Sequence, residues 1–563
     1  MDKKKMLRTI LLVLLGIAFL GVYYYVTIPA VNLHSKGTWG VILFLVFVLM
    51  LLSGLKQLQK SGADTVEGIR AFRFRFKEFG LVFKALAILL ILLGLFYVIG
   101  SLLSSPFFNA AKYQRLLTIE EREFTDDIKE VDYKTIPLLD RDSASLLGNR
   151  KMGSMVDMVS QFEVSGDYSQ INYQGKPVRV TPLTYASPIK WLTNQKNGIP
   201  AYILIDMTTQ NTECVKLSEG IKYSKGEYFN RNLYRHLRFR FPTYIFDDQI
   251  FFEIDEEGTP YWVCPVKKFN IGLFGGQTVG RVVLCNAQTG ECVDYAVEDV
   301  PSWIDKVYSA ELLVRLYDYS GLLKHGYWNS MLGQKDCLQS TNGYNYIALE
   351  DDVWVYTGIT SVSGDQSNVG FVLMNQRTME TRSYKVEGAI EDSAMSSAEG
   401  QVQNLGYRAT FPLLLNIADE PTYFMALKDG AGLVKKYAMV NVQKYQWVAI
   451  GDTVQECERN YTGLLSTNGI VSESASAGKS VSGKIESISP VVLEGNTHYY
   501  LCLEGREDIY DIDLSNAALL QIIRYQEGTP LLWSTGKATD SMKSLTFHRE
   551  MSKIVTNSKW KAG

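Results

Sequence analysis

The sequence predicts a membrane protein with three N-terminal transmembrane α-helices and a multi-domain α+β extracytoplasmic region, mostly antiparallel sheet, that ends in a small β-barrel. Three observations lead to this fold class. The long apolar segments lie before residue 112, short β-branched and aromatic runs follow from about residue 150, and five such runs close the chain after residue 480. A chain of 563 residues with 46% hydrophobic and 21% charged residues is long enough for several domains and too apolar to be disordered.

Three segments without Asp, Glu, Lys or Arg predict a membrane anchor within residues 1–112: 10–33, 37–55 and 85–111. A helix needs roughly 20 apolar residues to cross a bilayer, and each segment is about that long or longer. The first segment exceeds the ~7–15 apolar residues of a signal peptide. No small-residue cleavage site follows it, so we expect a retained span.

The basic residues predict the orientation of these spans. Lys3, Lys4, Lys5 and Arg8 precede the first span, and the loop 56–84 holds seven Lys and Arg against three Asp and Glu. Basic flanks stay in the cytoplasm, so we expect the N-terminus and this loop inside the cell and the chain after about residue 112 outside. Spacings of three and four predict an amphipathic helix at the cytoplasmic interface from Ile69, Phe72, Phe76, Phe79 and Phe83.

The charge of the outer region limits its partners. Residues 1–112 hold 13 Lys and Arg and 4 Asp and Glu of the chain's 57 and 60, so the rest holds 44 and 56, a net charge of −12. Nucleic acid is not expected as a ligand, because phosphate binding needs a basic surface. We expect the lipid bilayer as one partner and an envelope protein or a wall polymer as another.

The outer region divides into parts that differ in composition and in hydrophobic pattern. The expected parts are a helical connector (113–150), two α+β domains (151–300 and 301–465), a Ser/Gly/Ala-rich linker (466–480), the barrel (481–550) and a basic tail (551–563). Within the two domains, strands are expected at 202–205, 244–254, 261–266, 353–360 and 371–374, and helices at 303–319, 393–403 and 453–465.

A basic run, 231–240, precedes an acidic run, 247–257, and the two predict a hairpin whose strands carry opposite charges. Glu253 and Asp255 occupy alternate positions of the acidic strand. Because glycan hydrolysis needs two carboxyl groups at a fixed separation, these two residues are the catalytic pair of the alternative, enzymatic hypothesis. A shared solvated face of one strand is the expected role.

One motif recurs along the outer region: an apolar run, an Asp or Asn, and a Thr three residues later. It stands at Asp206, Asn286 and Asn375, with a looser copy at Asp429, where Gly432 takes the place of Thr. A second strand follows each copy, so the motif predicts a β-hairpin closed by the Asp or Asn side chain. The first three copies are 80 and 89 residues apart, whereas a propeller repeats every ~40–50 residues, so a propeller is not expected.

The second copy, Asn286-Ala-Gln-Thr-Gly-Glu291, resembles the D-x-x-T-G-[EK] hairpin of PepSY modules, small α+β domains of bacterial envelope proteins. It differs in using Asn for Asp, and the copies with Thr209 and Thr378 lack the Gly. PepSY domains are regarded as binding or regulatory modules, so the resemblance implies a non-catalytic role.

Five short strands are expected after the linker, at 481–492, 498–503, 509–512, 531–535 and 544–548, with a helix at 514–521. This order resembles a small OB-like or SH3-like barrel. In this compartment we expect an interaction module rather than an oligonucleotide reader.

All seven cysteines lie in the outer region, without C-x-x-C and without the Cys/His spacing of a zinc site. Cys285 and Cys292 flank the second hairpin, so a local disulfide is the alternative to the expected role as small buried apolar side chains. The segment 475–480 ends like a phosphate-binding loop, but Glu473 stands where that motif requires Gly. No metal and no cofactor is expected.

A group of aromatic residues is the remaining candidate for a ligand or partner surface: Tyr327, Trp328, Tyr344, Tyr346 and Trp354. If these side chains are exposed, they are suited to bind carbohydrate or peptide by stacking. If they are buried, they belong to the hydrophobic core, and core packing is the expected role.

The sequence favours a membrane-anchored binding or scaffolding protein of the cell envelope, because neither H-E-x-x-H nor G-x-S-x-G occurs in it. The alternative is a cell-surface hydrolase that acts on wall polymer or peptide through dispersed carboxylates. A transporter subunit is not favoured, because no Asp or Glu lies inside a span. Carboxylates gathered in a deep outer cleft would favour the hydrolase.

Overall fold

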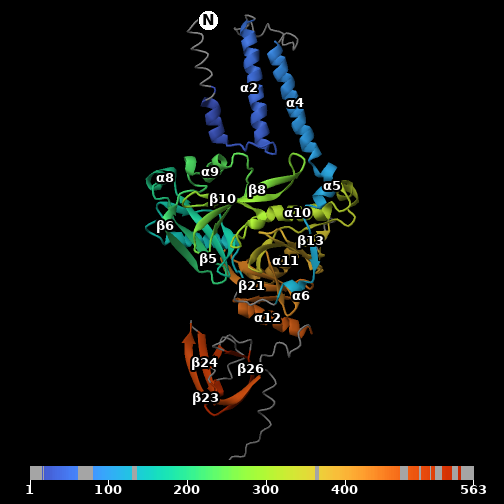
Figure 1. The fold of residues 1–563 in the computed structure, drawn as a ribbon. Helices are drawn as coiled ribbons and strands as arrows, with labels where there is room; N and C mark the ends of the chain where they lie inside the picture. Colours follow the sequence, from blue (N-terminus) through green and yellow to red (C-terminus); the bar gives the residue numbers. More distant parts are fainter. Residues whose placement is uncertain are drawn as a thin grey trace, which may run out of the picture. The chain divides into compact units, whose positions relative to one another are not determined.

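The computed structural model describes residues 16, 18–60, 80–129, 136–361, 367–469, 480–493, 496–506, 509–513, 523–535 and 543–546. They fall into two compact units, Met1–Cys457 and Glu458–Gly563, whose elements are labelled in Figure 1.

Two N-terminal helices are long and apolar enough to cross a membrane: α2 (Lys36–Lys60) and α4 (Leu81–Leu103). No residue of the apolar window of α4 is buried among the described residues, although α4 packs along α2, where Trp39 contacts Phe96 and Tyr97. The first predicted span is described only in part, as helix over 18–27, and 61–79, with most of the predicted amphipathic helix, lie outside the described residues. The described part therefore holds two complete apolar helices rather than three.

The third predicted span, 85–111, is divided. α4 ends at Leu103 and a second helix, α5 (Pro106–Gln114), begins at Pro106. Ser105 is extended, with φ −78° and ψ 158°, because a proline disfavours helical backbone at the residue before it. α5 then turns onto the folded part of unit 1, where the buried Tyr113 donates to the carbonyl of Ser104 (2.7 Å).

Four sheets of the same kind build the rest of unit 1. Each contains an antiparallel meander of four strands, and we number the sheets in chain order. The first sheet holds β3 (Ser169–Tyr173), β4 (Lys176–Tyr185), β5 (Ile199–Asp206) and β6 (Thr212–Ile221). The second holds β7 (Phe251–Ile254), β8 (Pro260–Ile271), β9 (Gly275–Asn286) and β10 (Cys292–Ala296). The third holds β12 (Asn345–Leu349), β13 (Asp352–Ser361), β15 (Gly370–Asn375) and β16 (Thr381–Tyr384). The fourth holds β19 (Leu413–Ile417), β20 (Glu420–Lys428), β21 (Val434–Asn441) and β22 (Val448–Gly451).

The repeat extends beyond the predicted hairpins. A short strand or bridge before each meander pairs with its second strand: β2 (Phe162–Val164), Phe246, β11 (Leu338–Ser340) and β18 (Arg408–Ala409). A helix follows each meander: α9 (Leu233–Arg240), α10 (Ala310–Leu322), α11 (Glu391–Gln401) and α12 (Val454–Thr467). A four-stranded meander is also the strand order of a propeller blade, and the helix in each repeat lengthens the interval. The interval of 80 and 89 residues therefore does not by itself exclude a propeller.

The Asp/Asn–Thr motif has the same hydrogen bonds in its first three copies. The Oδ1 of Asp206, Asn286 or Asn375 accepts from the backbone N–H groups two and three residues later. The Thr hydroxyl accepts from the N–H two residues further on. Each copy joins the third and fourth strands of its sheet, as the predicted hairpins require.

The predicted fourth copy, at Asp429, also closes a β-hairpin, but at a different place in its sheet from the first three copies. Asp429 closes the turn between the second and third strands of the fourth sheet, accepting from the N–H groups of Ala431 (2.9 Å) and Leu433 (3.0 Å). The equivalent connection begins at Asn441, whose Oδ1 accepts from the N–H of Lys444 (2.8 Å). An Asx side chain indicates a tight turn but does not indicate which turn of the sheet it closes.

The basic run 231–240 forms a helix, α9, so the predicted charged hairpin is wrong. Asn232 caps the helix through the N–H of Arg235, and Leu233 and Leu237, four residues apart, are buried on one face. The acidic run becomes a strand only at Phe251–Ile254, where β7 pairs with β8.

The predicted connector, 113–150, contains α6 (Phe124–Asp127), α7 (Arg141–Gly153) and a strand that the sequence did not predict, β1 (Glu120–Arg122). β1 pairs in parallel with β16, and Glu120 lies opposite Arg382. All three residues of β1 are exposed, so no alternation of apolar and polar residues marks the strand. One part of the connector, β1, is thus an edge of the third sheet, whereas α7 packs on the first sheet.

Apolar clusters join neighbouring sheets of unit 1. One spans the first and second sheets and includes Tyr202 and Trp262. Another spans the second and third sheets through α10 and includes Val282, Leu313 and Val372. The boundary expected near residue 300 therefore lies inside unit 1.

Unit 2 contains the five strands expected after the linker: β23 (Ser480–Leu493), β24 (Asn496–Leu503), β25 (Ile509–Asp513), β26 (Pro530–Thr535) and β27 (Lys543–Thr546). They pair in the closed order β23-β24-β25-β27-β26. Linker residues 470–479, the predicted helix 514–521 and the tail 551–563 lie outside the described residues. The OB-like or SH3-like identity of the barrel stays a prediction.

Candidate functional site

Glu253 is completely buried, as is Cys285 among the other predicted site residues. It lies on β7, is 0% exposed, and accepts hydrogen bonds from the backbone N–H groups of Asp305 and Lys306, both at 3.0 Å. The expectation that Glu253 occupies a solvated strand face is therefore wrong. β7 is the first strand of the second sheet and contacts β3 and β4 of the first sheet, so a neighbouring sheet covers it.

Asp255 has a different role. It follows the end of β7, and its Oδ1 accepts from the N–H groups of Glu257 (3.1 Å) and Thr259 (2.7 Å) in the turn to β8. One carboxylate of the predicted pair thus anchors a buried loop, and the other closes a turn. This arrangement does not provide the two opposed acids that glycan hydrolysis requires.

A group of polar residues surrounds Glu253, and we call it the buried cluster: Asn172, Glu253, Asp305, Lys306 and Tyr346. Asp305 accepts from the N–H of Asn172 on β3 (2.6 Å). The ammonium of Lys306 lies 4.4 Å from the centre of the Tyr346 ring on β12. Side chains and backbone from the first, second and third sheets therefore meet at this cluster.

Burial shifts the pKa of three groups of the cluster: Glu253, Asp305 and Lys306. Removal from water raises the pKa of Glu253 to about 7 and raises the pKa of Asp305 well above its usual range. Burial, reinforced by the positive charge of Arg179, lowers the pKa of Lys306 to about 8. All three side chains are at most 5% exposed. The cluster can therefore exchange protons near neutral pH, but a substrate has no direct access to it.

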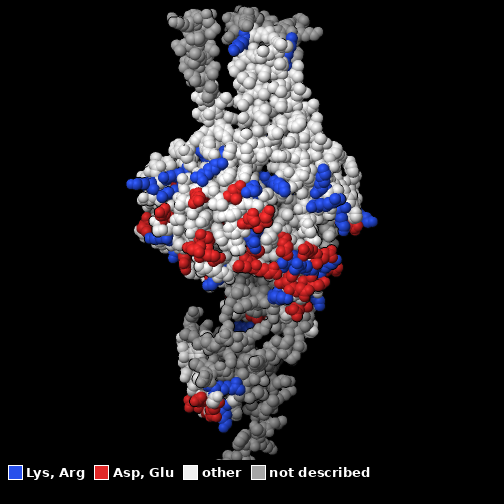
Figure 2. Space-filling model, in the orientation of Figure 1, with Lys and Arg blue, Asp and Glu red and all other residues white. Residues whose placement is uncertain are grey.

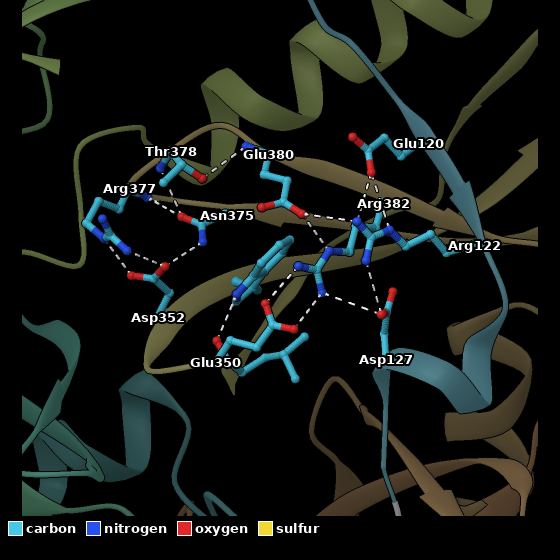
Figure 3. Close-up of polar contacts among 12 residues, drawn as sticks. Glu120, Arg122, Asp127, Glu350, Asp352, Asn375, Arg377, Thr378, Glu380 and Arg382 are labelled. Carbon is cyan, nitrogen blue, oxygen red and sulfur yellow. Dashed lines mark hydrogen bonds and ion pairs between the residues drawn. The ribbon is translucent and has the colours of Figure 1, made fainter. Parts of the chain in front are cut away.

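A second polar network lies on the third sheet (Figure 3). Arg382 on β16 is 4% exposed and makes ion pairs with Glu350 (2.7 Å), Glu380 (2.7 Å) and Asp127 (3.8 Å). Burial alone would lower the pKa of Arg382, but the hydrogen bonds to Glu350 and Glu380 outweigh burial and raise the pKa. The network ties the segment around β1 to the sheet.

The two networks are linked through the β12–β13 turn. Asp352 receives hydrogen bonds from Arg377 (2.6 and 2.7 Å) and from Asn375 of the third motif copy (2.8 Å) (Figure 3). Its neighbour Asp351 accepts from the side chain of Asn172, which belongs to the buried cluster (2.6 Å). These hydrogen bonds of Asp351 and Asp352 could not be predicted from the sequence, because each joins residues that lie far apart in the chain.

The predicted aromatic group is split among three places. The ring of Tyr344 lies 5.8 Å from that of Tyr346, and Trp354 lies 4.4 Å beneath the guanidinium of Arg382. Tyr327 and Trp328 lie 6.0 Å apart and pack against Phe107 of α5. Trp354 is 1% exposed and belongs to the core, whereas Trp328 is 65% exposed. The five residues therefore form no common ligand surface.

Cys285 and Cys292 lie directly opposite each other on β9 and β10, as the hairpin requires, and their thiols are free. The ring of His236, which lies on α9, is close to both thiols, and nothing in the sequence indicates this proximity. A hydrogen bond from Cys285, together with the neighbouring His236, lowers the pKa of Cys292 to about 5. This group is the one place where the described residues gather soft metal ligands or reactive thiols.

Two of the hollows in the described part of unit 1 bear on the hydrolase hypothesis, and neither gathers carboxylates. One, lined by residues that include Leu139 and Phe424, holds Asp140 alone of the acidic residues. The other, lined by residues that include Ser367 and Tyr445, holds Glu387 alone. Neither hollow contains a pair of acids that could serve as acid and nucleophile.

Comparison with known proteins assigns the chain to no family. No family model and no curated protein sequence matches it. A Synechocystis apocarotenoid oxygenase variant aligns with 70% of this chain and 67% of its own length, at 10% identity and a TM-score of 0.15. A B. megaterium levansucrase variant aligns with 75% of this chain and 98% of its own, at 8% identity and a TM-score of 0.17. Scores this low establish no shared fold.

Proposed function

We propose that the protein is a membrane-anchored binding or scaffolding protein of the cell envelope, and that its outer region does no catalysis of its own. One observation carries the proposal: the ends of the apolar helices are hydrogen-bonded into the folded part of unit 1. The helices are thus built to hold this folded part against one face of a bilayer.

The first helix is joined to the segment around α9. Arg235 and Arg238 donate to the carbonyls of Tyr25 (3.2 Å) and Ile28 (3.0 Å), which end that helix. The guanidinium of Arg235 also lies 4.4 Å from the centre of the Tyr25 ring. Val31 donates to the carbonyl of Pro242 (2.7 Å). The basic residues of α9 therefore satisfy the free carbonyls of a helix end, where cations are favourable.

The other two helices meet the β8–β9 turn. The Oγ of Ser104, directly after α4, accepts from the N–H of Leu273 (2.8 Å). His34, two residues before the start of α2, contacts the carbonyl of Leu273 through Nδ1 (2.7 Å) and stacks on Phe269 at 5.6 Å. Three helix ends and one sheet therefore share a single junction.

Exposed apolar side chains flank this junction. Beside the α9 contacts they include Ile189 (70% exposed) and Phe229 (64%). Beside α4 and α5 they include Phe108, Trp328 and Leu332. Large apolar side chains of this kind, with an exposed Trp among them, suit the interface between headgroups and acyl chains.

The charges support the proposed orientation. Figure 2 shows the α2 and α4 surface as largely uncharged, with basic side chains at the end of these helices remote from the sheets. Lys56 and Lys84 lie at that end, as the positive-inside rule requires for a cytoplasmic loop. The acidic outer region then lies outside the cell.

A binding role, rather than a hydrolytic one, is supported by the structural roles of three carboxylates. Glu253, Asp255 and Asp352 each hold backbone or side-chain groups of the fold, and the described residues give no support to a hydrolase acting through Glu253 and Asp255. The PepSY-like hairpin and the five-stranded barrel fit an interaction protein, with an envelope protein or a wall polymer as the partner.

Site-directed labelling tests the topology. We expect a bulky, membrane-impermeant maleimide to label Val156→Cys on intact cells, because Val156 is 84% exposed on the folded part of unit 1. Ser61→Cys, in the loop after α2, should be labelled only after the membrane is opened. The unmodified chain gives the background from its own cysteines.

Labelling of Ser61→Cys on intact cells, with Val156→Cys protected, would show that the orientation is inverted. Release of the chain from membranes by alkaline carbonate would show that it is not anchored at all. A partner is then sought by cross-linking from Val156→Cys on cells whose topology has been established.

A further inference from the structure

The hairpin of the second motif copy places two thiols side by side. The N–H of Asn286 donates to the carbonyl of Glu291 (2.9 Å), so the neighbouring pair, Cys285 and Cys292, is a non-hydrogen-bonded pair of the ladder. Side chains of such pairs lie close together on one face of the sheet. Cys285 is buried, and Cys292 is partly exposed.

A third side chain reaches the thiols from another element. His236 lies in α9, its ring centre is 4.4 Å from that of Tyr223, and its Nε2 is 2.7 Å from the carbonyl oxygen of Gly290. Gly290 has φ +74°, and a Cβ added there would lie 2.5 Å from the Tyr223 ring. The glycine thus allows the turn, Tyr223 and His236 to pack together.

We propose that His236, Cys285 and Cys292 bind a thiophilic metal ion of the zinc type. Their ligand atoms all lie within 4.8 Å of one another. Zinc bonds of ~2.0–2.3 Å need ligand atoms roughly 3.5–3.8 Å apart, so small side-chain rotations close the site. Two thiolates and an imidazole prefer zinc or another soft ion over calcium or magnesium, which take oxygen ligands.

The surroundings supply what a metal site needs besides its ligands. The carbonyl of Gly290 holds the imidazole in place, and a carbonyl is a common hydrogen-bond partner for the second nitrogen of a ligating histidine. His236 and Cys292 are partly exposed, so an ion can enter, and water can occupy the fourth position. The sequence shows no zinc spacing because His236 precedes Cys285 by 49 residues and belongs to a helix.

A disulfide between Cys285 and Cys292 is the competing state, since directly opposite cysteines meet the distance requirement for that bond. The two states exclude each other, because a disulfide removes both sulfur ligands. The proximity of His236 favours the metal, since a disulfide makes no use of an imidazole.

Cobalt titration of the full-length protein tests the proposal. The detergent-solubilised chain, reduced and freed of metal, is titrated with Co²⁺ without oxygen. We expect one equivalent to bind with thiolate-to-cobalt charge-transfer absorption and tetrahedral visible bands, and Zn²⁺ to displace it. Cys292→Ser should abolish the charge-transfer band, and His236→Gln should weaken binding by about tenfold or more, at least the effect of losing a second-shell partner.

Cys214→Ser is the matched control, because Cys214 is also partly exposed but lies on β6 outside the site; its Co²⁺ binding should be unchanged. Unfolding temperatures of the three variants verify that they are folded. Two results would overturn the proposal: Co²⁺ binding that survives in Cys292→Ser, or a Cys285–Cys292 disulfide in metal-free protein from membranes whose free thiols were blocked before lysis.

Discussion

Glu253 shows how one buried carboxyl group can make stability depend on pH. Its two oxygens hold the N–H groups of Asp305 and Lys306, and burial raises its pKa to about 7. In the unfolded chain the pKa of a glutamate is about 4.3. Between about pH 4.5 and 7 the folded protein therefore binds a proton that the unfolded chain has lost.

We expect the stability of unit 1 to fall as the pH rises through this window. The slope from Glu253 is at most about 1.4 kcal/mol per pH unit, since the unfolded state binds fewer protons than the folded state. Glu253→Gln cannot ionise and should flatten the dependence. The measurement is the midpoint of thermal unfolding of the detergent-solubilised chain at several pH values.

Glu163→Gln serves as the control, because Glu163 is exposed and its loss should leave the slope as it is. Above about pH 8 Lys306 adds an opposite trend: its lowered pKa means that the folded protein releases a proton that the unfolded chain retains, so stability rises with pH. A slope between pH 4.5 and 7 that is the same with and without Glu253 would contradict the assignment.

Glu253 also marks the limit of sequence-based prediction at this scale. Glu253 and Asp255 are alternate residues of an acidic run and look alike in sequence. Their environments differ because the first sheet and the 305–306 backbone cover one, whereas the other follows the end of β7. Only residues far along the chain decide this, and local periodicity contains no information about them.

At the scale of elements, Arg382 holds β1 against β16. Arg382→Ala would remove the cation that Glu350, Glu380 and Asp127 share, although Arg122 also pairs with the last two, and would remove the guanidinium stacked on Trp354. Because Arg382 itself is buried whereas Glu350 and Glu380 stay in contact with water, we expect a loss of about 1–3 kcal/mol in the free energy of unfolding. Hydrogen exchange should also become faster in β1, which pairs only with β16 among the described strands.

Lys385→Ala is the matched control on the same segment. The ion pair of Lys385 with Glu121 is exposed on both sides, 81% and 69%, so its loss should lower stability far less than the loss of Arg382. Equal effects of the two substitutions would show that the network of Figure 3 contributes no more than a surface pair.

The elements were predictable where local chemistry fixes them. The Asp/Asn motif predicted four hairpins, because in each the Asp or Asn side chain caps its own turn. The first two strands of each sheet have no such motif, so the four-stranded repeat was not seen. α9 was not predicted, because its arginines were interpreted as one face of a charged strand. Two helix signals are present: Leu233 and Leu237 are four residues apart, and Asn232 stands at the N-cap position.

At the scale of the whole molecule, the junction between helices and sheets sets what lies at the bilayer surface. Contacts with Arg235, Arg238 and Leu273 hold three helix ends against the folded part of unit 1. The apolar side chains beside these contacts must then lie at the depth where the helices leave the hydrocarbon. Trp328 is the most useful of them, because it packs on Phe107 and is 65% exposed.

Lipid quenching of Trp328 tests this placement in nanodiscs. We expect lipids brominated near the headgroup end of their chains to quench part of the tryptophan emission, because an indole at the interface lies within contact distance of them. Trp328→Phe should remove that part and leave a smaller quenched fraction. Trp447→Phe is the comparison, since Trp447 lies in the β21–β22 turn with Lys444 4.1 Å from its ring, and the amount of emission that the lipid quenches should not change. If the emission lost in Trp328→Phe is that of an indole in water and is not quenched by brominated lipid, the helices still anchor the chain, but the folded part stands off the membrane.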